Sequence, residues 1–473
     1  MNGDGCSSDC KVETYWKCEG GSFLSPDTCL CDTSDSKIKL FVGSCQLIDE
    51  KTEESAAIAS TAFKVASAAA VGGFLSAQLF SGATGSFLAT ILNSLGLMSL
   101  LKYCDVEFPP NVEKFFGILA NNTDVLPNPF KYIPHEKQTS SYYRFGTFED
   151  PVLFLDNAGG SLAMILISVA VVFCLKLLVF IFKKLKATTF THYLSKILAV
   201  FEWDNTLSYF VGNQTDFFCA WMVQLSQPTY DTYGSINFAL ALFTAVTALV
   251  VCLLLCRIIH KHWNQKQVLE YSVTDTRNSN AQRYPKFNFL WGANHGESVF
   301  SRYFILFQIA KNGLMVAVIY FLPQAPFVQS YLLTLLSTTF FIMIAVQKPL
   351  TGMLQLAMLL LNEFLLALEG GILMIFAVNK RLGCLDFASA MNLGWALVGL
   401  IIGTLGLNTL LALISIPMSI RAAYCKKRQS DISRAKRQKR RIMLTTNSDN
   451  NRTETELLEI VRRRITTVTD SNT

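Results

Sequence analysis

The chain has 473 residues, of which 51% are hydrophobic and only 16% are charged, and its formal net charge is +6. Its mean hydropathy of +0.34 is higher than that of an ordinary soluble chain. This composition argues against a soluble enzyme.

Six of the 13 cysteines lie within the first 45 residues, in a polar stretch too short to bury a core of its own. Dense cysteine in a small extracytoplasmic segment is typical of disulfides, which offset the missing core. Zinc is the alternative, but no pair of these cysteines has CxxC spacing and no histidine lies nearby. We therefore predict a disulfide-rich segment over residues 1–52. Its candidate cysteines are Cys6, Cys10, Cys18, Cys29, Cys31 and Cys45.

Nine apolar blocks of about 20 residues follow, which is the length that carries a helix across roughly 30 Å of hydrocarbon. They predict an all-α polytopic membrane bundle of about nine transmembrane helices over residues 53–417. The first block is rich in Ala, Ser and Gly, the second is short, and the fourth contains polar residues. The blocks are Ala57–Phe80, Phe87–Tyr103, Ala158–Phe182, Thr206–Gln227, Ile236–Cys256, Tyr303–Leu322, Val328–Val346, Leu354–Val378 and Ala388–Ile416.

The distribution of Lys and Arg predicts the topology, because short loops rich in these residues stay cytoplasmic. Basic clusters follow the third and the fifth blocks. Both clusters can be cytoplasmic only if an even number of crossings separates them, so the fourth block, Thr206–Gln227, has to span. The count then places the N-terminus and loop 104–157 outside or in a lumen. It places loops 183–205 and 257–302 and a partly disordered tail, 418–473, in the cytoplasm.

The predicted outer loop contains a glycosylation sequon at Asn121. A second sequon begins at Asn213 inside a predicted span, and we expect it to stay unmodified. The plasma membrane is the expected location, although an endomembrane facing its lumen has the same topology.

Four ionisable residues fall inside predicted spans, where each costs about 3 kcal/mol or more unless it is paired or hydrated. They are Asp216, Lys311, Glu363 and Glu369. The two glutamates are six residues apart, which on a helix is about 9 Å of rise and roughly 240° of rotation. They cannot share one narrow face, so we expect one to face Lys311 and the other to face a different helix or a water-filled space.

Two interpretations of these four residues stay open. In the first, Lys311 and Glu363 form a buried ion pair that holds two helices in register. In the second, one or more of the acids contacts a permeating cation or proton. The neighbouring Asn312 and Asn362 are expected to form hydrogen bonds between helices.

Two further patterns concern helix contacts. Gly399 and Gly403 have the GxxxG spacing that lets helices approach closely, either within the bundle or in a contact that makes a homo-oligomer. The segment Ala187–Asp204 is amphipathic, which predicts either a helix lying along the membrane interface or a helix packed under the bundle.

The tail has ten basic residues between Arg421 and Arg441. Each is worth about 1 kcal/mol of attraction near an anionic leaflet, so the cluster predicts binding of acidic lipids. The alternative is that it only fixes the topology. We expect no nucleic-acid role for a tail held at the bilayer. The candidate lipid-binding residues are Lys426, Lys427, Arg428, Lys436, Arg437, Lys439, Arg440 and Arg441.

Motifs of catalysis are absent from the sequence, which has no P-loop, no GxSxG elbow and no HExxH, and its five histidines are scattered. We therefore predict neither an enzyme activity nor a metal site nor a cofactor.

The N-terminal run Asn2–Glu13, followed by Trp16, Cys18 and Gly20–Ser22, resembles the second half of the myxobacterial-type cysteine-rich repeat. Such a repeat begins with CGDG and CDDGN elements, which the sequence does not contain ahead of this run. The resemblance implies that residues 1–52 are the remnant of a repeat and that the chain is the C-terminal part of a larger surface protein. Some of the six cysteines would then lack their native partners.

The membrane region resembles that of protist proteins with such repeats, and it is similar to the fungal transient receptor potential-like and flavin-carrier family. The segments that carry the resemblance are Ile91–Met98, Phe108–Val112, Phe115-Phe116, Tyr143–Gly146, Phe154–Gly159, Gln347–Pro349 and Leu361–Glu363. It implies a core like that of a cation channel or a transporter. We expect a cation channel or channel-like protein. A flavin-carrier-like transporter and a surface receptor or adhesion protein anchored by the helices are the alternatives.

Overall fold

The computed structural model describes most of the chain up to residue 411. The described residues are 16–19, 28–31, 38–41, 44–47, 49–81, 85–120, 128–134, 151–201, 204–229, 231–272, 298–350 and 353–411, with single residues 413, 414, 417 and 421. The chain divides into two compact units, Met1–Leu413 and Ile414–Thr473. The features described below lie in the first unit.

Two small antiparallel hairpins form the N-terminal segment. Strand β1 (Trp16–Glu19) pairs with β2 (Thr28–Cys31), and β3 (Ile38–Phe41) pairs with β4 (Ser44–Leu47). A disulfide joins Cys18 to Cys29 at directly opposed positions of the first hairpin, and another joins Cys31 to Cys45 between the hairpins. Disulfide bonding is thus confirmed for four of the six candidate cysteines, while Cys6 and Cys10 lie outside the described residues.

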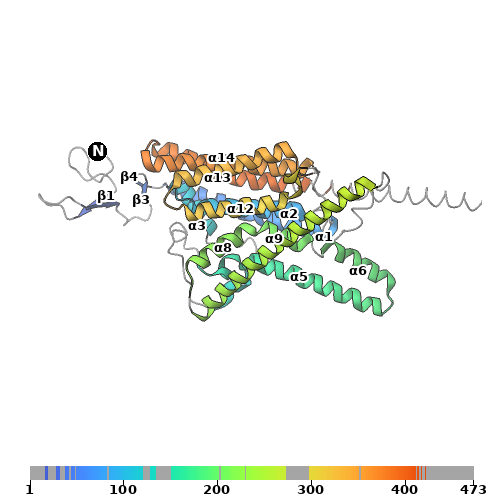
Figure 1. Cartoon of the computed structure of the whole chain (residues 1–473). Coiled ribbons are helices and arrows are strands. Elements are labelled where there is room, and N and C mark those ends of the chain that lie inside the picture. Colours follow the sequence, from blue (N-terminus) through green and yellow to red (C-terminus); the bar gives the residue numbers. More distant parts are fainter. Residues whose placement is uncertain are drawn as a thin grey trace, which may run out of the picture. The chain divides into compact units, whose positions relative to one another are not determined.

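The described residues in the rest of the first unit are mostly helical (Figure 1). Its helices, in chain order, are α1 (Glu50–Ser81), α2 (Gly85–Leu100), α3 (Pro110–Ala120), α5 (Phe154–Lys184), α6 (Thr188–Phe201), α7 (Asp204–Gly212), α8 (Gln214–Ser226), α9 (Thr232–Ser272), α11 (Val299–Arg302), α12 (Phe304–Phe321), α13 (Pro326–Gln347), α14 (Met353–Leu382) and a last helix, Phe387–Leu411. The 3-10 helices η1 (Leu101–Tyr103) and η2 (Pro129–Tyr132) lie in the segment between α2 and α5.

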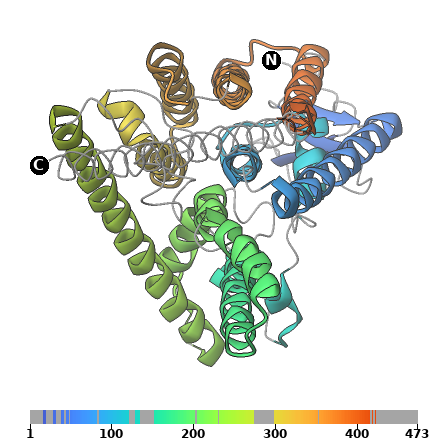
Figure 2. The same cartoon turned by 90° about the vertical axis from the view of Figure 1, so that its right-hand side faces the viewer.

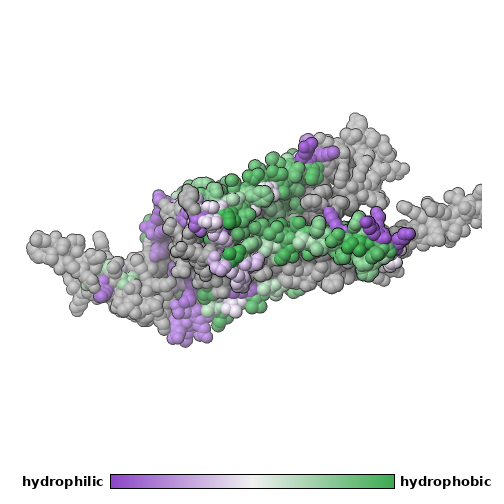
Figure 3. Space-filling view, turned by 90° about the horizontal axis from the view of Figure 1, so that it is seen from below, coloured by the Kyte–Doolittle hydropathy of each residue, from purple (hydrophilic) through white to green (hydrophobic). Residues whose placement is uncertain are grey.

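Six helices in the described part of the chain are long and apolar enough to cross a membrane. They are Phe154–Lys184, Thr232–Lys261, Phe304–Phe321, Pro326–Gln347, Met353–Leu382 and Phe387–Leu411. On the face shown in Figure 3, hydrophobic residues cover the middle of the helices and hydrophilic residues gather toward both ends. The chain is therefore a multi-pass membrane protein, and these six helices correspond to the third, fifth, sixth, seventh, eighth and ninth predicted blocks.

The other three predicted spans are helical but are not among the six. The first corresponds to α1 and the second to α2, whose 16 residues rise only about 24 Å, less than the thickness of the hydrocarbon. The prediction of one continuous helix over Thr206–Gln227 is wrong, because α7 ends at Gly212 and α8 begins at Gln214. The count of nine spans therefore stays a prediction.

The break between α7 and α8 has a local cause. A Cβ on Gly212 would lie 2.9 Å from the Cβ of Leu92 and 3.1 Å from the Cα of Ala89, so only glycine lets α7 approach α2 this closely. Glycine is a poor helix former, as is asparagine to a lesser degree. Asn213 follows, and its side chain turns back to donate a hydrogen bond of 2.9 Å to the Tyr209 carbonyl.

Helices extend into the loops predicted between spans. Helix α9 continues past Arg257 to Ser272, so the segment 257–302 begins as a helix and not as a loop. The segment 104–157 contains α3, and α5 begins at its end, at Phe154. The amphipathic segment after α5 is helix α6, as predicted. Its Phe190 ring lies 4.8 Å from the ring of Phe182 in α5, yet Phe190 stays largely exposed.

The glycines that bring helices together are not the predicted pair. A Cβ on Gly399 or on Gly403 would meet no atom within 4 Å, so the expectation that this pair packs inside the bundle is wrong for the described residues. Gly370 in α14 packs against Thr334 in α13 instead, and Gly394 in the last helix packs against Asn111 in α3.

Helix α2 occupies a central position in the bundle (Figure 2). It contacts α1, α7, α8 and α14. The largest buried apolar cluster surrounds it, and it includes Phe115 and Phe116 of α3, Met315 of α12 and Phe376 of α14. Polar residues of α2 consequently face protein on several sides, which determines where the candidate site forms.

Candidate functional site

Polar side chains gather where α2 packs against α12, α14 and the last helix. On α2, Asn93 and Ser94 are adjacent in sequence and thus about 100° apart around the helix axis. Asn93 accepts a hydrogen bond from Asn312 of α12, and the Ser94 hydroxyl accepts a hydrogen bond of 2.8 Å from the Asn362 amide of α14. The two asparagines thus form bonds between helices, as predicted.

Lys311 and Glu363 lie on the α12 side of α14. The Lys311 Nζ is 2.5 Å from the Glu363 Oε1, and each side chain is only 3% exposed. The Lys311 ammonium also lies 5.0 Å from the centre of the Phe340 ring of α13, where a cation–π contact adds to the pair. The two opposite charges offset one another and link α12 to α14.

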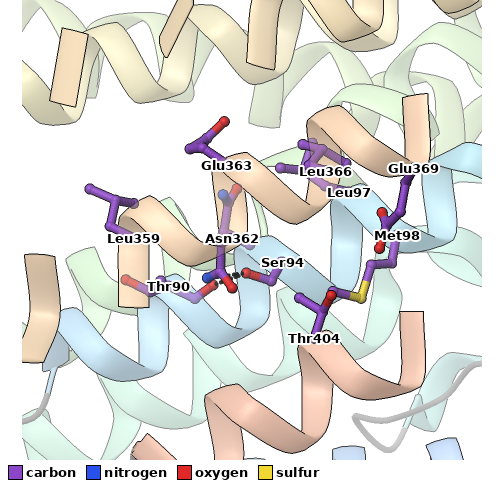
Figure 4. Close-up of a pocket in the computed structure, with 11 residues that line it drawn as sticks. Thr90, Ser94, Leu97, Met98, Leu359, Asn362, Glu363, Leu366, Glu369 and Thr404 are labelled. Atoms are coloured by element: carbon purple, nitrogen blue, oxygen red, sulfur yellow. Dashed lines mark hydrogen bonds between the residues drawn. The ribbon is translucent and has the colours of Figure 1, made fainter. Parts of the chain in front are cut away.

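A small cavity lies between α2, α14 and the last helix (Figure 4). Its volume is about 20 Å³, which is room for about one water molecule. The lining residues are Thr90, Asn93, Ser94, Leu97, Met98, Leu359, Asn362, Glu363, Leu366, Glu369 and Thr404.

Glu369 is the acid whose carboxyl group enters this region. Figure 4 shows it directed toward Met98 and Thr404, whereas Glu363 points away on the other side of α14. The residue is 1% exposed, and neither carboxyl oxygen has a well-formed hydrogen bond to any described residue. The Thr404 hydroxyl interacts with the carboxyl group, but it donates its hydrogen bond to the Leu400 carbonyl at 2.8 Å.

The last helix contains further buried polar atoms that lack a hydrogen-bond partner among the described residues. Asn408 follows Thr404 by four residues, so it lies on the same helix face about 6 Å further along the axis. It is fully buried, and both polar atoms of its amide lack a partner in the described part of the chain. The Asn362 Oδ1 lacks one as well. Buried groups of this kind usually bind water or an ion, since leaving them dry costs about 1–3 kcal/mol each.

Asp216 lies apart from these residues. It is in the first turn of α8, where its Oδ2 accepts a hydrogen bond of 3.3 Å from the Ser161 hydroxyl of α5. Its other oxygen lies beside Gly96 of α2. The structure therefore joins Lys311 to Glu363 and separates Glu369 and Asp216 into two different environments.

Two buried polar residues of the last helix, one of which lines the cavity, were not identified from the sequence. Thr404 and Asn408 are spaced four residues apart in an apolar block, and this spacing was the available signal. Asn121 and the candidate tail residues from Lys426 to Arg441 lie outside the described residues. Where the chain is described, no group of three His, Cys, Asp or Glu side chains is arranged to hold a metal ion.

No family model, curated protein or solved structure matches this chain. The relation to transient receptor potential-like and flavin-carrier proteins therefore remains a prediction from the segments named above.

Proposed function

We propose that this multi-pass membrane protein is a channel-like protein that carries a small cation across the bilayer, and that Glu369 is the carboxylate that binds the cation. The observation that carries the proposal is a deeply buried acid, in a membrane-spanning helix, without a counter-charge among the described residues. Intramembrane acids of this kind are costly, and in membrane proteins they mark ion pathways and proton relays.

The surroundings of Glu369 support a cation of small size. The cavity has room for about one water molecule, so it suits a proton or a single dehydrated metal ion and is far too small for a flavin. Thr404 and Asn362, which line the cavity, supply neutral oxygen atoms, the ligand type that hard cations prefer. In a receptor or adhesion protein whose helices serve only as a membrane anchor, an unpaired buried acid at this position would lower the stability without serving a function.

Lys311 and Glu363 have a structural role in this proposal. Because their charges offset one another, Glu363 is unavailable to a passing ion while the pair is intact.

The cavity that contains Glu369 is narrow, so passage of an ion requires α14 and the last helix to separate. The resemblance of Ile91–Met98 to channel-like proteins agrees with the proposal, since Ser94, Leu97 and Met98 line the cavity.

Flux measurements on the purified full chain in liposomes test this function. Separate arms impose gradients of protons, of sodium and of potassium, which distinguishes the cations that share this chemistry. We expect flux of at least one of them, reduced at least about tenfold by Glu369→Gln, which is the effect of losing about 1.4 kcal/mol of binding.

Glu54→Gln is the matched control, because it removes an exposed acid of α1 by the same chemical change. It should leave the flux as in the wild type. A wild-type protein without flux of any of the three cations would contradict the proposed function. A Glu369→Gln variant with unchanged flux would remove Glu369 from the pathway.

A further inference from the structure

The cavity beside Glu369 offers few oxygen atoms to a metal ion. Among its described lining residues, the side chains with an oxygen that lacks a hydrogen-bond partner are Glu369, Asn362 and Glu363, and Glu363 points away on the other side of α14 (Figure 4). Calcium and magnesium gather about six or more oxygen ligands, and potassium channels replace the water shell of the ion with rings of carbonyl oxygens. Glu369 and Asn362 together provide three such oxygens, which are too few to replace the water shell of a metal ion.

The hydroxyl group of Thr404 accepts hydrogen bonds on the side that faces Glu369. Its O–H donates to the Leu400 carbonyl at 2.8 Å, so the hydroxyl proton is already used within the last helix. The oxygen therefore presents lone pairs to the carboxyl group beside it, and these repel an ionised carboxylate but accept a hydrogen bond from a neutral carboxylic acid. Thr404 is 2% exposed, so bulk water does not replace it in this role.

Charges that would hold Glu369 in its ionised form are absent from the described helices around it. Helices α2 and α13 and the last helix contain no Asp, Glu, Lys, Arg or His. The nearest charged residue on α14 is Glu363, and α12 supplies Lys311, but these two pair with each other at 2.5 Å. A carboxylate charge buried without a partner is far more costly than a neutral carboxylic acid. The surroundings of Glu369 thus suit the acid.

We propose that the cation carried by this protein is the proton, and that Glu369 holds it as a neutral carboxylic acid whose O–H donates to the Thr404 hydroxyl oxygen. The inference rests on the proposed function and narrows it from small cations in general to one. Thr404 is a positioning residue in this arrangement, because it orients the acid and does not itself carry the proton.

Transfer of a proton at this site requires only the carboxyl group and water. Water on one side of the membrane delivers the proton to a Glu369 carboxylate oxygen, where the O–H bond forms, and water on the other side accepts it, which breaks that bond. No group is oxidised or reduced, and the costly carboxylate exists only between the two steps. The cavity has room for about one water molecule, and such a water would have Glu369 and the Asn362 Oδ1 as partners.

Flux measurements on the purified full chain in liposomes test the choice of ion. A pH-sensitive dye inside the vesicles reports proton entry, and uptake of sodium and of potassium is measured in parallel at equal ionic strength. We expect proton flux without sodium or potassium flux, and a loss of at least about tenfold in the proton flux for Glu369→Gln. Glutamine is a neutral isostere of the acid, so this variant should keep the Tm of the wild type.

Infrared difference spectra of the wild type and Glu369→Gln test the neutral acid independently of transport. The wild type should have the carbonyl stretch of a protonated carboxylic acid, displaced in heavy water, and the variant should lack this band. Thr404→Val keeps the shape of the side chain and removes the acceptor, so it should move the band to higher frequency. Thr404→Ser keeps the hydroxyl and should leave the band in place.

Thr409→Val is the matched control on the same helix. The Thr409 hydroxyl donates to the Leu405 carbonyl at 2.8 Å, as the Thr404 hydroxyl donates to Leu400, but Thr409 is not among the residues that line the cavity. It should leave both the band and the proton flux as in the wild type. A band that moves equally in Thr404→Val and Thr409→Val would contradict Thr404 as the acceptor.

The outcomes separate this inference from the proposed function. Sodium or potassium flux without proton flux would overturn the assignment of the proton and leave the proposed function standing, whereas a wild type without flux of any of the three cations would contradict both. A protonated-carboxyl band that persists unchanged in Glu369→Gln would remove Glu369 as the proton carrier. If Glu369→Gln does not fold, the ion selectivity of the wild type and the spectrum of Thr404→Val decide the matter.

Discussion

Helices α5 and α12 both have the length and hydropathy of membrane spans, but they contact the protein to very different extents. The most apolar 18-residue window of α5 has a hydropathy of 3.0 and only 6% of it is buried, whereas the window of α12 has a hydropathy of 1.7 and 61% of it is buried. The more hydrophobic helix is therefore the more exposed one, the reverse of what water-soluble proteins show.

The difference follows from the solvent. Lipid tails surround apolar side chains as favourably as other protein side chains do, so hydrophobicity alone does not draw α5 inward. Polar groups have no partner in hydrocarbon, so Lys311 and Asn312 require α12 to lie inside the bundle. Buried polarity thus determines which helices form the interior of this protein, and substitutions inside the bundle and on its lipid-facing surface test the comparison.

The largest effect is expected for Lys311→Met, which leaves Glu363 buried and unpaired. Breaking a buried ion pair on one side costs about 3–5 kcal/mol. The measurement is the free energy of unfolding in mixed micelles with increasing denaturing detergent. The double variant Lys311→Met with Glu363→Met should recover most of the loss, because no unpaired charge remains. A double variant as unstable as the single one would show that apolar packing, and not charge, governs this position.

A smaller loss is expected for Gly370→Ala, at the contact of α14 with α13. The added Cβ would lie 2.5 Å from the Thr334 Oγ1 and 3.3 Å from the Thr334 Cα, so the Thr334 side chain has to rotate away and the backbones have to shift by a few tenths of an ångström. Such overpacking costs about 1–3 kcal/mol. The neighbouring Gly371→Ala meets no atom within 4 Å and should instead be neutral or stabilising by up to about 1 kcal/mol, as alanine favours helix. Equal Tm values for the two variants would contradict this close approach.

The smallest effect is expected on α5. Phe173 is 67% exposed, and in a bilayer its ring contacts lipid. Phe173→Leu should therefore change the free energy of unfolding by no more than about 0.5 kcal/mol. Cross-linking of the purified protein in membranes accompanies the measurement. A loss near 2 kcal/mol together with cross-linked dimers would mean that α5 faces a second copy of the chain, which would end the contrast with α12.

Hydropathy correctly predicted the long, continuous apolar helices, because an uninterrupted apolar run of about 20 residues is enough to identify such a helix. It did not predict the helix break within Thr206–Gln227, where counting loop charges required a span that the structure leaves unconfirmed. The chain breaks there because Gly212 approaches α2, and a contact between segments more than 100 residues apart leaves no trace in local composition. The loop predicted after Cys256 failed for a related reason, since the charged residues that follow it continue the helix to Ser272.

The candidate site was partly predictable from helix geometry. The offset of six residues required Glu363 and Glu369 to face different ways, and Glu363 pairs with Lys311 while Glu369 faces the cavity. The identity of the neighbours could not be predicted in this way. Thr404 is beside Glu369, and Gly96 beside Asp216, only because particular faces of separate helices meet, and a single sequence does not specify those faces.

Helix α9 is longer than a bilayer is thick. Its 41 residues extend about 62 Å, roughly twice the hydrocarbon thickness, while the apolar run of its sequence ends at Cys256. Its far end at Ser272 is therefore carried beyond the lipid by the same continuous hydrogen-bonded rod. A small tilt of the embedded half would displace that end by a larger distance than it displaces the part within the lipid.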